Sequence, residues 1–530
     1  MLERLLDQIK SAKAERIGIE TIMRECFDLT HPMMGVGLQG NTSPDATSAL
    51  YDASSRKSAR IYDSTQTDAV RQLASLIVSG MVPSNTRWFD LDVAQDPEFR
   101  HAWLDDTADA IWREIHTSNF DTAIFDLVTM LIIGGYGAMY QGYDVERASL
   151  EFDAWPIWQT FVCESRAGGP ADIVYRVFSL TPQQAISEYG ADNLSEEIRT
   201  AANTGGKKMY EFVHAIYPRQ DGIAGSQSMQ KPVASVHIDV SNRQIVRESG
   251  FDEMPLAVPR WKKIANSAYA TGPVYDALPD IKTLQDVVKF KLANAEMAVA
   301  GMWGAVDDGV INPSSIKVGP RQIVVMSSPE SFFPLKPPGD IGVAFAEIDN
   351  LRMQVRKTML VESMQLPQGG NQTATEINVR VELMRQLLGP VFGRLQSELL
   401  NNVVQRAFGL LLRSGKVDAP PEELSGATLN VRFVSPLARS QRLGEVAAMD
   451  RFEMGLMQLS QVKPDVLDTY DFEMAASEKS WLLGVPQKLM RSDRDIKKIR
   501  QARADAAAAQ QEQAMQDEIA VQTVPKQLGG

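Results

Sequence analysis

The sequence predicts an α+β fold that is predominantly helical, and two periodicities carry this prediction. Apolar residues recur at helical spacing through most of the 530 residues. A central block from Leu150 to Trp261 instead alternates with a period of two, which is typical of strands. Because a chain of this length exceeds what one compact core holds, we expect several sub-domains.

Helices are expected before the central block, and strands within it. The early helices end at breakers such as His31-Pro32 and Pro83. Their predicted spans are residues 1–30, 65–81, 105–116 and 119–137. The predicted strands are Ile173–Leu180, Met209–Tyr217, Pro232–Val240 and Gln244–Glu248. A short helix is expected at Pro182–Tyr189, between the first two strands.

Two helices of similar length are expected to flank a small strand-rich insert. The first begins at Pro273 and continues to about Gly301. Proline- and glycine-rich turns then break residues 302–340 into short strands, and residues 341–360 are helical again.

The longest predicted helix follows a polar loop, Met364–Gln372, and spans Ala374 to Arg413. Thr373 and Glu376 fit a capping box, in which the hydroxyl accepts from the amide of Glu376 and the carboxylate reaches back. The apolar positions at helical spacing are Ile377, Val381, Met384, Leu388, Val391, Leu395, Leu399, Val403, Ala407 and Leu411. At 1.5 Å per residue this helix would run roughly 60 Å.

The pair Gly389-Pro390 is expected to kink this helix. The proline lacks the amide that would bond to Gln386, and its ring crowds that carbonyl. A strand is then expected at Leu429–Val434, and helices dominate from Arg439 to about Met515.

Composition and charge exclude several classes of protein. The two cysteines, Cys26 and Cys163, lack the Cys-x-x-Cys spacing of a structural zinc site and make no disulfide framework. The most apolar run, Leu127–Met139, is too short to span a bilayer, and residues 1–30 open with an amphipathic helix rather than a secretory signal. The net charge of −13 argues against tight, non-specific wrapping of DNA, although DNA could still slide past.

Ser235, His237 and Asp239 are the nearest approach to a catalytic set. They alternate along one predicted strand, so neighbouring side chains point to one face about 6.6 Å apart. A triad needs hydrogen-bond contacts of roughly 3 Å, from groups that converge. We therefore interpret the three residues as a solvated polar strand face, with a hydrolase built around them as the alternative.

No catalytic, cofactor or metal site is predicted. Residues 205–208 lack the upstream glycine and the hydroxyl residue of a nucleotide-binding loop. The acidic pairs Asp105-Asp106 and Asp307-Asp308 are better explained by helix N-terminal charge and by a turn than by magnesium ligation.

Four stretches, in order, carry a resemblance to a known family. They are Arg71–Phe89, Gly250–Pro273, Thr373–Leu395 and Gly484–Ser492. In this order and spacing the chain resembles the portal, or head-to-tail connector, proteins of short-tailed bacteriophages. One departure is Ala270, since members of that family often have glycine directly after the preceding tyrosine.

The resemblance implies a ring, usually of twelve subunits, around a channel for double-stranded DNA. It implies a portal-like fold with wing, stem, clip and crown regions. The implied regions are a wing (1–272), a stem helix (273–301), a clip (302–340), a second stem helix (341–360), a tunnel loop (361–372), a long kinked helix with a wing strand (373–440), a helical crown (441–515) and a flexible tail (516–530).

The resemblance also implies which residues face the DNA. The tunnel loop would present amides and glycines, namely Gln365, Gln368, Gly369, Gly370, Asn371 and Gln372. Neutral amides bond to phosphates weakly and release them, whereas clustered cations would add a salt-dependent grip. From the residues alone, an exposed connector between two helices explains the loop equally well.

The implied function is structural: a DNA conduit at one capsid vertex, used for genome packaging and ejection. The implied partners are further copies of the chain, double-stranded DNA, the large terminase, tail adaptor or nozzle proteins, and major capsid and scaffolding proteins. The implied location is the head–tail junction of the virion, after assembly in the host cytoplasm. A minor capsid or scaffold protein without a DNA channel is the alternative.

Overall fold

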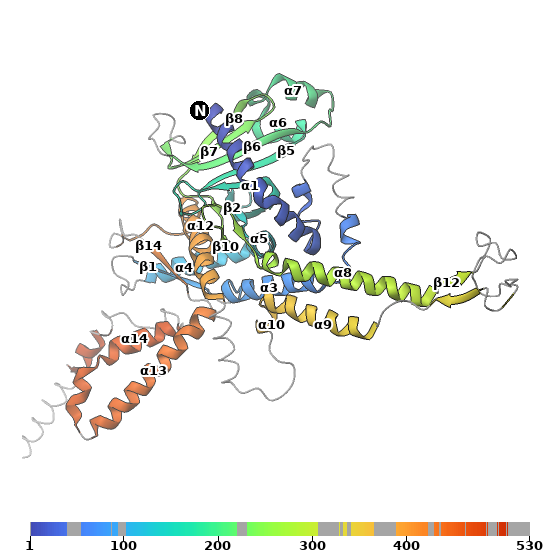
Figure 1. The fold of residues 1–530 in the computed structure, drawn as a ribbon. Helices are drawn as coiled ribbons and strands as arrows, with labels where there is room; N and C mark the ends of the chain where they lie inside the picture. The colour runs from blue at the N-terminus through green and yellow to red at the C-terminus, as the bar shows by residue number, and fades with distance from the viewer. Residues whose placement is uncertain are drawn as a thin grey trace, which may run out of the picture.

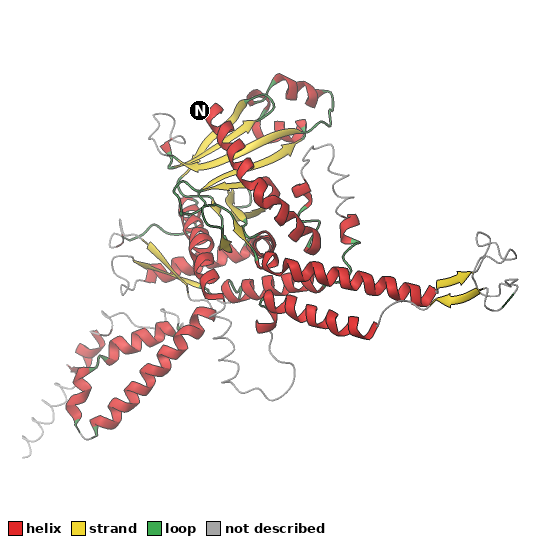
Figure 2. Cartoon of the chain, viewed as in Figure 1, coloured by secondary structure: helices red, strands yellow, loops and turns green. Residues whose placement is uncertain are grey.

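The computed structural model describes most of the chain between residues 2 and 506. The described residues are 2–39, 55–85, 87–93, 102–219, 230–300, 302–305, 328, 332–335, 341–364, 388–421, 424, 429–433, 436–461, 463–483, 485, 496, 498–504 and 506. Figure 1 shows a body of helices and sheets from which a pair of helices extends on one side, while a helical hairpin projects on the other. The prediction of a helix-rich α+β chain is confirmed, and Figure 2 shows how helices dominate outside one sheet-rich region.

The largest sheet has five antiparallel strands in the order β4-β5-β6-β7-β8. Their bounds are β4 (Thr160–Cys163), β5 (Ile173–Leu180), β6 (Tyr210–Pro218), β7 (Val233–Asp239) and β8 (Gln244–Phe251). The four long strands therefore lie where the period of two predicts them. The structure adds β4 at one edge.

Helices cover both faces of this sheet. The start of α1 (Leu2–Thr30) packs Leu5, Leu6 and Ile9 against one face. The other face is covered by α6 (Pro182–Tyr189) and α7 (Glu196–Asn203), which the chain inserts between β5 and β6. The sheet is thus a buried layer, and α7 is a helix that the sequence analysis did not predict.

Smaller sheets join segments far apart in the chain. β1 (Phe89–Val93) pairs antiparallel with β14 (Leu429–Phe433), and Leu91 lies opposite Val431. A three-stranded sheet, in the order β3-β2-β9, consists of β2 (Ala138–Asp144), β3 (Ser149–Trp155) and β9 (Leu256–Ala257). A further pair is formed by β10 (Lys262–Lys263) and β11 (Ala270–Thr271). The predicted strand at 429–434 is confirmed, whereas β1 was not predicted.

The main core surrounds α5 (Phe120–Gly134), which is buried over most of its length. It is packed by α3 (Thr65–Met81) and α8 (Pro273–Ala300), and α4 (Ala102–Thr117) precedes it in the chain. The helix ends before the expected residue 137, because Gly135 adopts a left-handed backbone with φ of 86°.

The helix α8 forms a hairpin with α9 (Ile341–Thr358), and the two run side by side away from the body (Figure 1). At the end of α8 the strands β12 (Met302–Ala305) and β13 (Phe332–Leu335) pair antiparallel. A short α10 (Val361–Met364) follows α9. The expected arrangement, two helices flanking a strand-containing insert, is confirmed for these described segments.

The long helix after the loop is described from residue 388 onward. Residues 388–395 are helical, Gln396–Leu400 form a π-turn, and α12 (Asn401–Arg413) completes the helix. Farther along, α13 (Pro436–Ser460) and α14 (Phe472–Leu482) form the separate hairpin, and α13 begins three residues before the predicted Arg439.

Candidate functional site: the root of the α8–α9 hairpin

Two polar clusters lie where the α8–α9 hairpin leaves the body. One is centred on Arg260, just before β10 and α8, and the other on Asp63, just before α3. Both bring together segments that are distant in sequence. We take this root as the candidate functional site because it is where forces on the hairpin would pass into the rest of the subunit.

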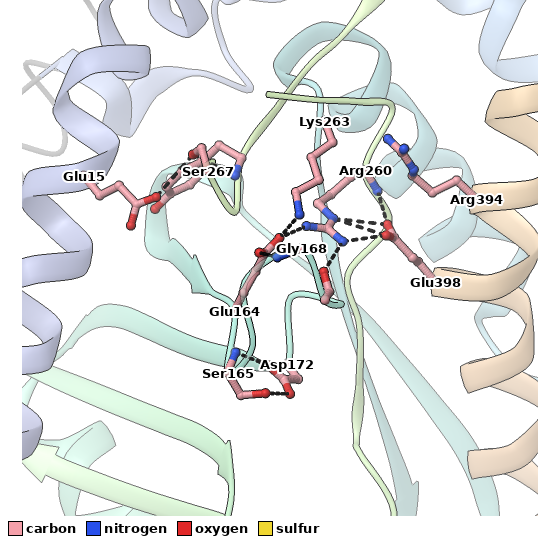
Figure 3. Close-up of polar contacts among 12 residues, drawn as sticks. Glu15, Glu164, Ser165, Gly168, Asp172, Arg260, Lys263, Ser267, Arg394 and Glu398 are labelled. Carbon is pink, nitrogen blue, oxygen red and sulfur yellow. Dashed lines mark hydrogen bonds and ion pairs between the residues drawn. The ribbon is translucent and has the colours of Figure 1, made fainter. Parts of the chain in front are cut away.

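The Arg260 cluster holds a guanidinium between two carboxylates (Figure 3). Arg260 donates from its backbone amide and from Nε to Glu398 at 3.0 Å and 3.2 Å, and from Nη2 to Glu398 Oε1 at 2.6 Å. On its other side Nη1 donates to Glu164 Oε1 at 2.6 Å. The carbonyl of Gly169 accepts a further bond from Nη2 at 2.9 Å.

A second cation balances the charges of this cluster. Lys263 forms an ion pair with Glu164, whose other oxygen accepts from the amide of Gly168 at 2.9 Å. Burial alone would raise the pKa of Glu164, but these bonds hold it below its usual value. Burial likewise opposes the charge on Arg260, yet its bonds to Glu398 and Glu164 raise its pKa above normal. Glu164 and Arg260 therefore stay charged at neutral pH.

Local backbone features place the two ends of the cluster. The left-handed Gly135 turns the chain out of α5, so that its carbonyl accepts from Trp261 N at 2.8 Å and Tyr136 forms a bridge with Arg260. Glu398 is carried by the π-turn of the long helix, and Asn402 Nδ2 donates to its carbonyl at 3.0 Å. The sequence had marked Arg260 only as part of a family motif.

The Asp63 cluster ties both helices of the hairpin to the start of α3. Gln285 on α8 accepts from the amides of Tyr62 and Asp63 and donates to the Asp63 carbonyl, at distances between 2.7 and 3.1 Å. Arg352 on α9 donates from Nη2 to Asp63 Oδ2 at 2.8 Å. The other carboxylate oxygen accepts from the amide of Thr65, the first residue of α3.

The interpretation of Ser235, His237 and Asp239 as a solvated face is wrong. All three are buried. Tyr189 of α6 contacts His237, while Ser235 lies beside His214, whose ring packs against Trp155 of β3. They do not bond to one another: Ser235 Oγ lies 2.9 Å from His214 Nε2, His237 Nδ1 lies 3.0 Å from the Tyr189 hydroxyl, and Asp239 accepts from Asn242. They are structural polar groups, each with a partner outside the set.

Within the described residues, no three His, Cys, Asp or Glu side chains are grouped to hold a metal ion. Asp105 lies in the first turn of α4 as expected and pairs with Arg87 at 3.1 Å. Among the helices that the structure describes, none is long and apolar enough to cross a membrane.

The first four residues of the predicted tunnel loop, Val361–Met364, form the helix α10 rather than a loop, and Val361 is buried in the main core. The predicted DNA-facing residues of the loop lie outside the described part of the chain. This applies to Gln365, Gln368, Gly369, Gly370, Asn371, Gln372 and the capping residues Thr373 and Glu376. Gly389 and Pro390 are described and lie in the helical residues 388–395. The kink predicted at this pair stays a prediction.

The comparisons with known proteins identify the family of this chain. Residues 2–490 match the family described as "Bacteriophage head to tail connecting protein", and the chain belongs to that family. It is 27% identical over 536 residues to the portal protein of Salmonella phage epsilon15, covering 97% of this chain and 93% of that protein. It is 25% identical over 489 residues to the probable portal protein of Bordetella phage BPP-1, covering 86% and 84%. The resemblance stated from the motifs is thereby confirmed.

Proposed function

We propose that this head-to-tail connector protein acts as a portal, a ring at one capsid vertex through which double-stranded DNA enters and leaves the head. The observation that carries the proposal is the α8–α9 hairpin, which leaves the body and is fixed at its root by the Asp63 cluster, through Gln285 on α8 and Arg352 on α9. A subunit that lines a channel under load needs such a rigid wall. Membership of the connector family supports the same role.

In this proposal each part of the chain has a mechanical role. Residues 273–301 and 341–360 are the stem that lines the channel, and 302–340 are the clip that docks the large terminase and later the tail adaptor or nozzle proteins. Residues 1–272 and 373–440 form the wing, 441–515 the crown inside the capsid and 516–530 the tail. Contacts with major capsid and scaffolding proteins would hold the ring at its vertex. The protein would be assembled in the host cytoplasm.

The proposed DNA contact is residues 361–372, the tunnel loop. Its amide side chains, from Gln365 to Gln372, bond to phosphates without the salt-dependent hold of lysine or arginine. The net charge of −13 works in the same direction, because a sliding DNA must not be bound tightly.

The ring is tested by negative-stain microscopy and analytical ultracentrifugation of the full-length protein. We expect a closed oligomer, with twelve subunits as the proposed number, and a central hole. A monomer or dimer at all salt and protein concentrations would overturn the proposal.

The role of the loop is tested by shortening residues 361–372 in procapsids. If the loop contacts DNA, rings should form normally while genome packaging falls. Normal packaging would indicate instead a capsid or scaffold protein in which this loop has no channel role.

A further inference from the structure

The corner between α9 and α10 contains a leucine with a left-handed backbone. Leu360 has a φ of 62° and lies between Met359 and Val361, the first residue of α10. Helices commonly end on a left-handed residue, but that residue is usually glycine, because other side chains are strained there. A leucine at this corner therefore requires a physical reason.

Leu360 differs from the other residues with this backbone. In the part of the chain that the structure describes, the other non-glycine residues with positive φ are Ala148, Arg243 and Asn266. Each lies in the turn between two successive antiparallel strands, where this conformation is common. Leu360 instead lies between two helices and packs against the main core. Backbone strain persists where the surrounding structure demands one particular geometry.

The pattern of burial shows what the corner achieves. The buried side chains along α9 and just after it recur at helical spacing, at Ile348, Leu351, Val355 and Met359. If the helix continued, Val361 would lie about 200° around the axis from Met359 and would point away from the core. Because the chain turns at Leu360, Met359 and Val361 are both fully buried, whereas Glu362 is exposed.

The short helix α10 is held by the body as well as by the hairpin. It packs against α9 and against α3, and Val361 belongs to the main core. Two backbone bonds close the corner: Met359 N donates to Val355 O at 3.0 Å, and Leu360 N donates to Lys357 O at 2.9 Å. The corner and the core together therefore set the direction of residues 361–364.

We propose that Leu360 is a positioning residue for the segment that contacts DNA in the proposed portal. Its left-handed backbone turns the chain after α9, and the packing of its side chain offsets the strain of that backbone. The corner thereby places α10, which begins the segment 361–372, on α3. The role toward DNA rests on the proposed function, whereas the placement of α10 does not.

Leu360→Ile tests the corner. Isoleucine has the volume of leucine but branches at Cβ, and a β-branched residue tolerates a left-handed backbone least. Hydrogen exchange of residues 359–364 and cryo-electron microscopy of the full-length protein report where α10 lies. We expect faster exchange there and an α10 displaced from α3. In procapsids, rings should form normally while genome packaging falls several-fold.

Ala148→Ile is the matched control. It introduces the same kind of strain, at a φ of 49°, in the exposed turn between β2 and β3. Exchange of residues 359–364 and genome packaging should both stay at the wild-type level in this variant.

A second pair of variants separates the backbone from the side chain, and it decides the question if Leu360→Ile does not assemble. Leu360→Gly and Leu360→Ala both remove the packed side chain, but only glycine adopts a φ of 62° without strain. We expect residues 359–364 to exchange more slowly in Leu360→Gly than in Leu360→Ala. Equal exchange in the two variants would contradict a role for the backbone of Leu360.

An α10 that stays on α3 in Leu360→Ile would overturn the proposal, since Met359 and Val361 would then hold the corner by themselves. A displaced α10 with normal packaging would overturn the role of Leu360 toward the DNA segment. A wild-type protein that forms no ring would overturn the proposed function instead, and the exchange measurement would still decide how α10 is placed.

Discussion

At the residue scale, the features that matter most are buried polar groups that hold distant segments together. Arg260 and Asp63 are almost inaccessible to solvent, and each bonds to at least two separate parts of the chain. Removing one partner of such a group leaves another polar atom buried and unpaired, which is the costly case. Single substitutions at the hairpin root should therefore have large effects.

Gln285→Ala should weaken the root of the hairpin. It removes the acceptor for two backbone amides, Tyr62 N and Asp63 N, and the donor to the Asp63 carbonyl. We expect the free energy of unfolding to fall by about 2–4 kcal/mol, measured by urea denaturation. Lys289→Ala, an exposed change one turn farther along α8, should alter it by less than about 0.5 kcal/mol. Equal effects of the two changes would contradict this assignment.

The stacked pair His214 and His237, with ring centroids 3.8 Å apart, should make stability depend on pH. Burial, followed by the positive charge of Arg247, lowers the pKa of His237 to about 3, and burial also lowers that of His214. Between pH 6.5 and about 3 the unfolded chain binds protons that the folded chain does not. The free energy of unfolding should therefore decrease as the pH is lowered through this range, by up to about 1.4 kcal/mol per pH unit for each histidine.

Urea unfolding of the wild type and of His237→Gln, compared between about pH 4 and pH 7, checks this slope. The variant keeps a polar partner for the Tyr189 hydroxyl, but glutamine binds no proton. The pH dependence of its free energy of unfolding should therefore correspond to about one fewer proton taken up on unfolding. Identical slopes would show that His237 does not contribute to the pH dependence of stability.

At the element scale, the ends and irregularities of helices decide how the core meets the hairpin. Tyr136, just after the end of α5, forms a β-bridge with Arg260, and the π-turn carries Glu398, which accepts from Arg260. Both depend on backbone conformations that deviate from the regular helix. Substitutions that forbid or straighten these conformations are the appropriate tests.

Gly135→Ala should destabilise the protein strongly. Its φ of 86° is strained for an L side chain, and a Cβ there would overlap the Ala270 backbone. We expect a loss of about 2–4 kcal/mol by thermal or urea unfolding. Gly80→Ala is the control: it lies within α3 with open space around it and should stabilise by about 0.5–1 kcal/mol.

Pro390→Ala tests the kink predicted for the long helix. Alanine restores the missing amide, so the helix should straighten with little loss of helix propensity, and we expect ring assembly to be impaired. Size-exclusion chromatography with negative-stain imaging measures the assembled fraction. If variant rings form and package DNA normally, the kink has no role.

At the scale of the whole molecule, apolar side chains remain exposed on the parts that extend from the body. On α8 these are Phe290, Leu292 and Met297, and on α13 they include Phe452, Met457 and Leu459. Contiguous apolar patches on a surface mark contacts with another protein, and several large apolar side chains exposed on one element make it a candidate for such a contact. In the proposed ring, neighbouring subunits would cover them.

Phe290→Asp should therefore prevent ring assembly without unfolding the subunit. Phe290 is 67% exposed in the single chain, so its replacement removes little intramolecular packing. We expect smaller species in sedimentation velocity, with an unchanged circular dichroism spectrum. Lys289→Asp, a neighbouring exposed change on the same helix, should leave assembly intact. Rings of normal size in Phe290→Asp would exclude this surface from the interface.

The sequence by itself determined the family and many of the helices and strands. Strand β5 and helix α6 have the bounds predicted from the sequence, because the spacing of residues along the chain directly reports a local backbone repeat. The alternation of Phe89, Leu91 and Val93 was a similar signal for β1, and it was missed. The π-turn at Gln396–Leu400 was not predicted either, since the sequence analysis expected a regular helix there.

Only the tertiary structure decided which polar residues are buried and what they contact. Arg260 and Glu398 are 138 positions apart, and Asp63 and Arg352 are 289 apart, so no local pattern relates them. The face of β7 with Ser235 and His237 alternates like a solvated one, but α6 packs over His237, and His214 and the main core enclose Ser235. Burial is set by what packs on top of an element, and that depends on the whole fold rather than on the spacing of its own residues.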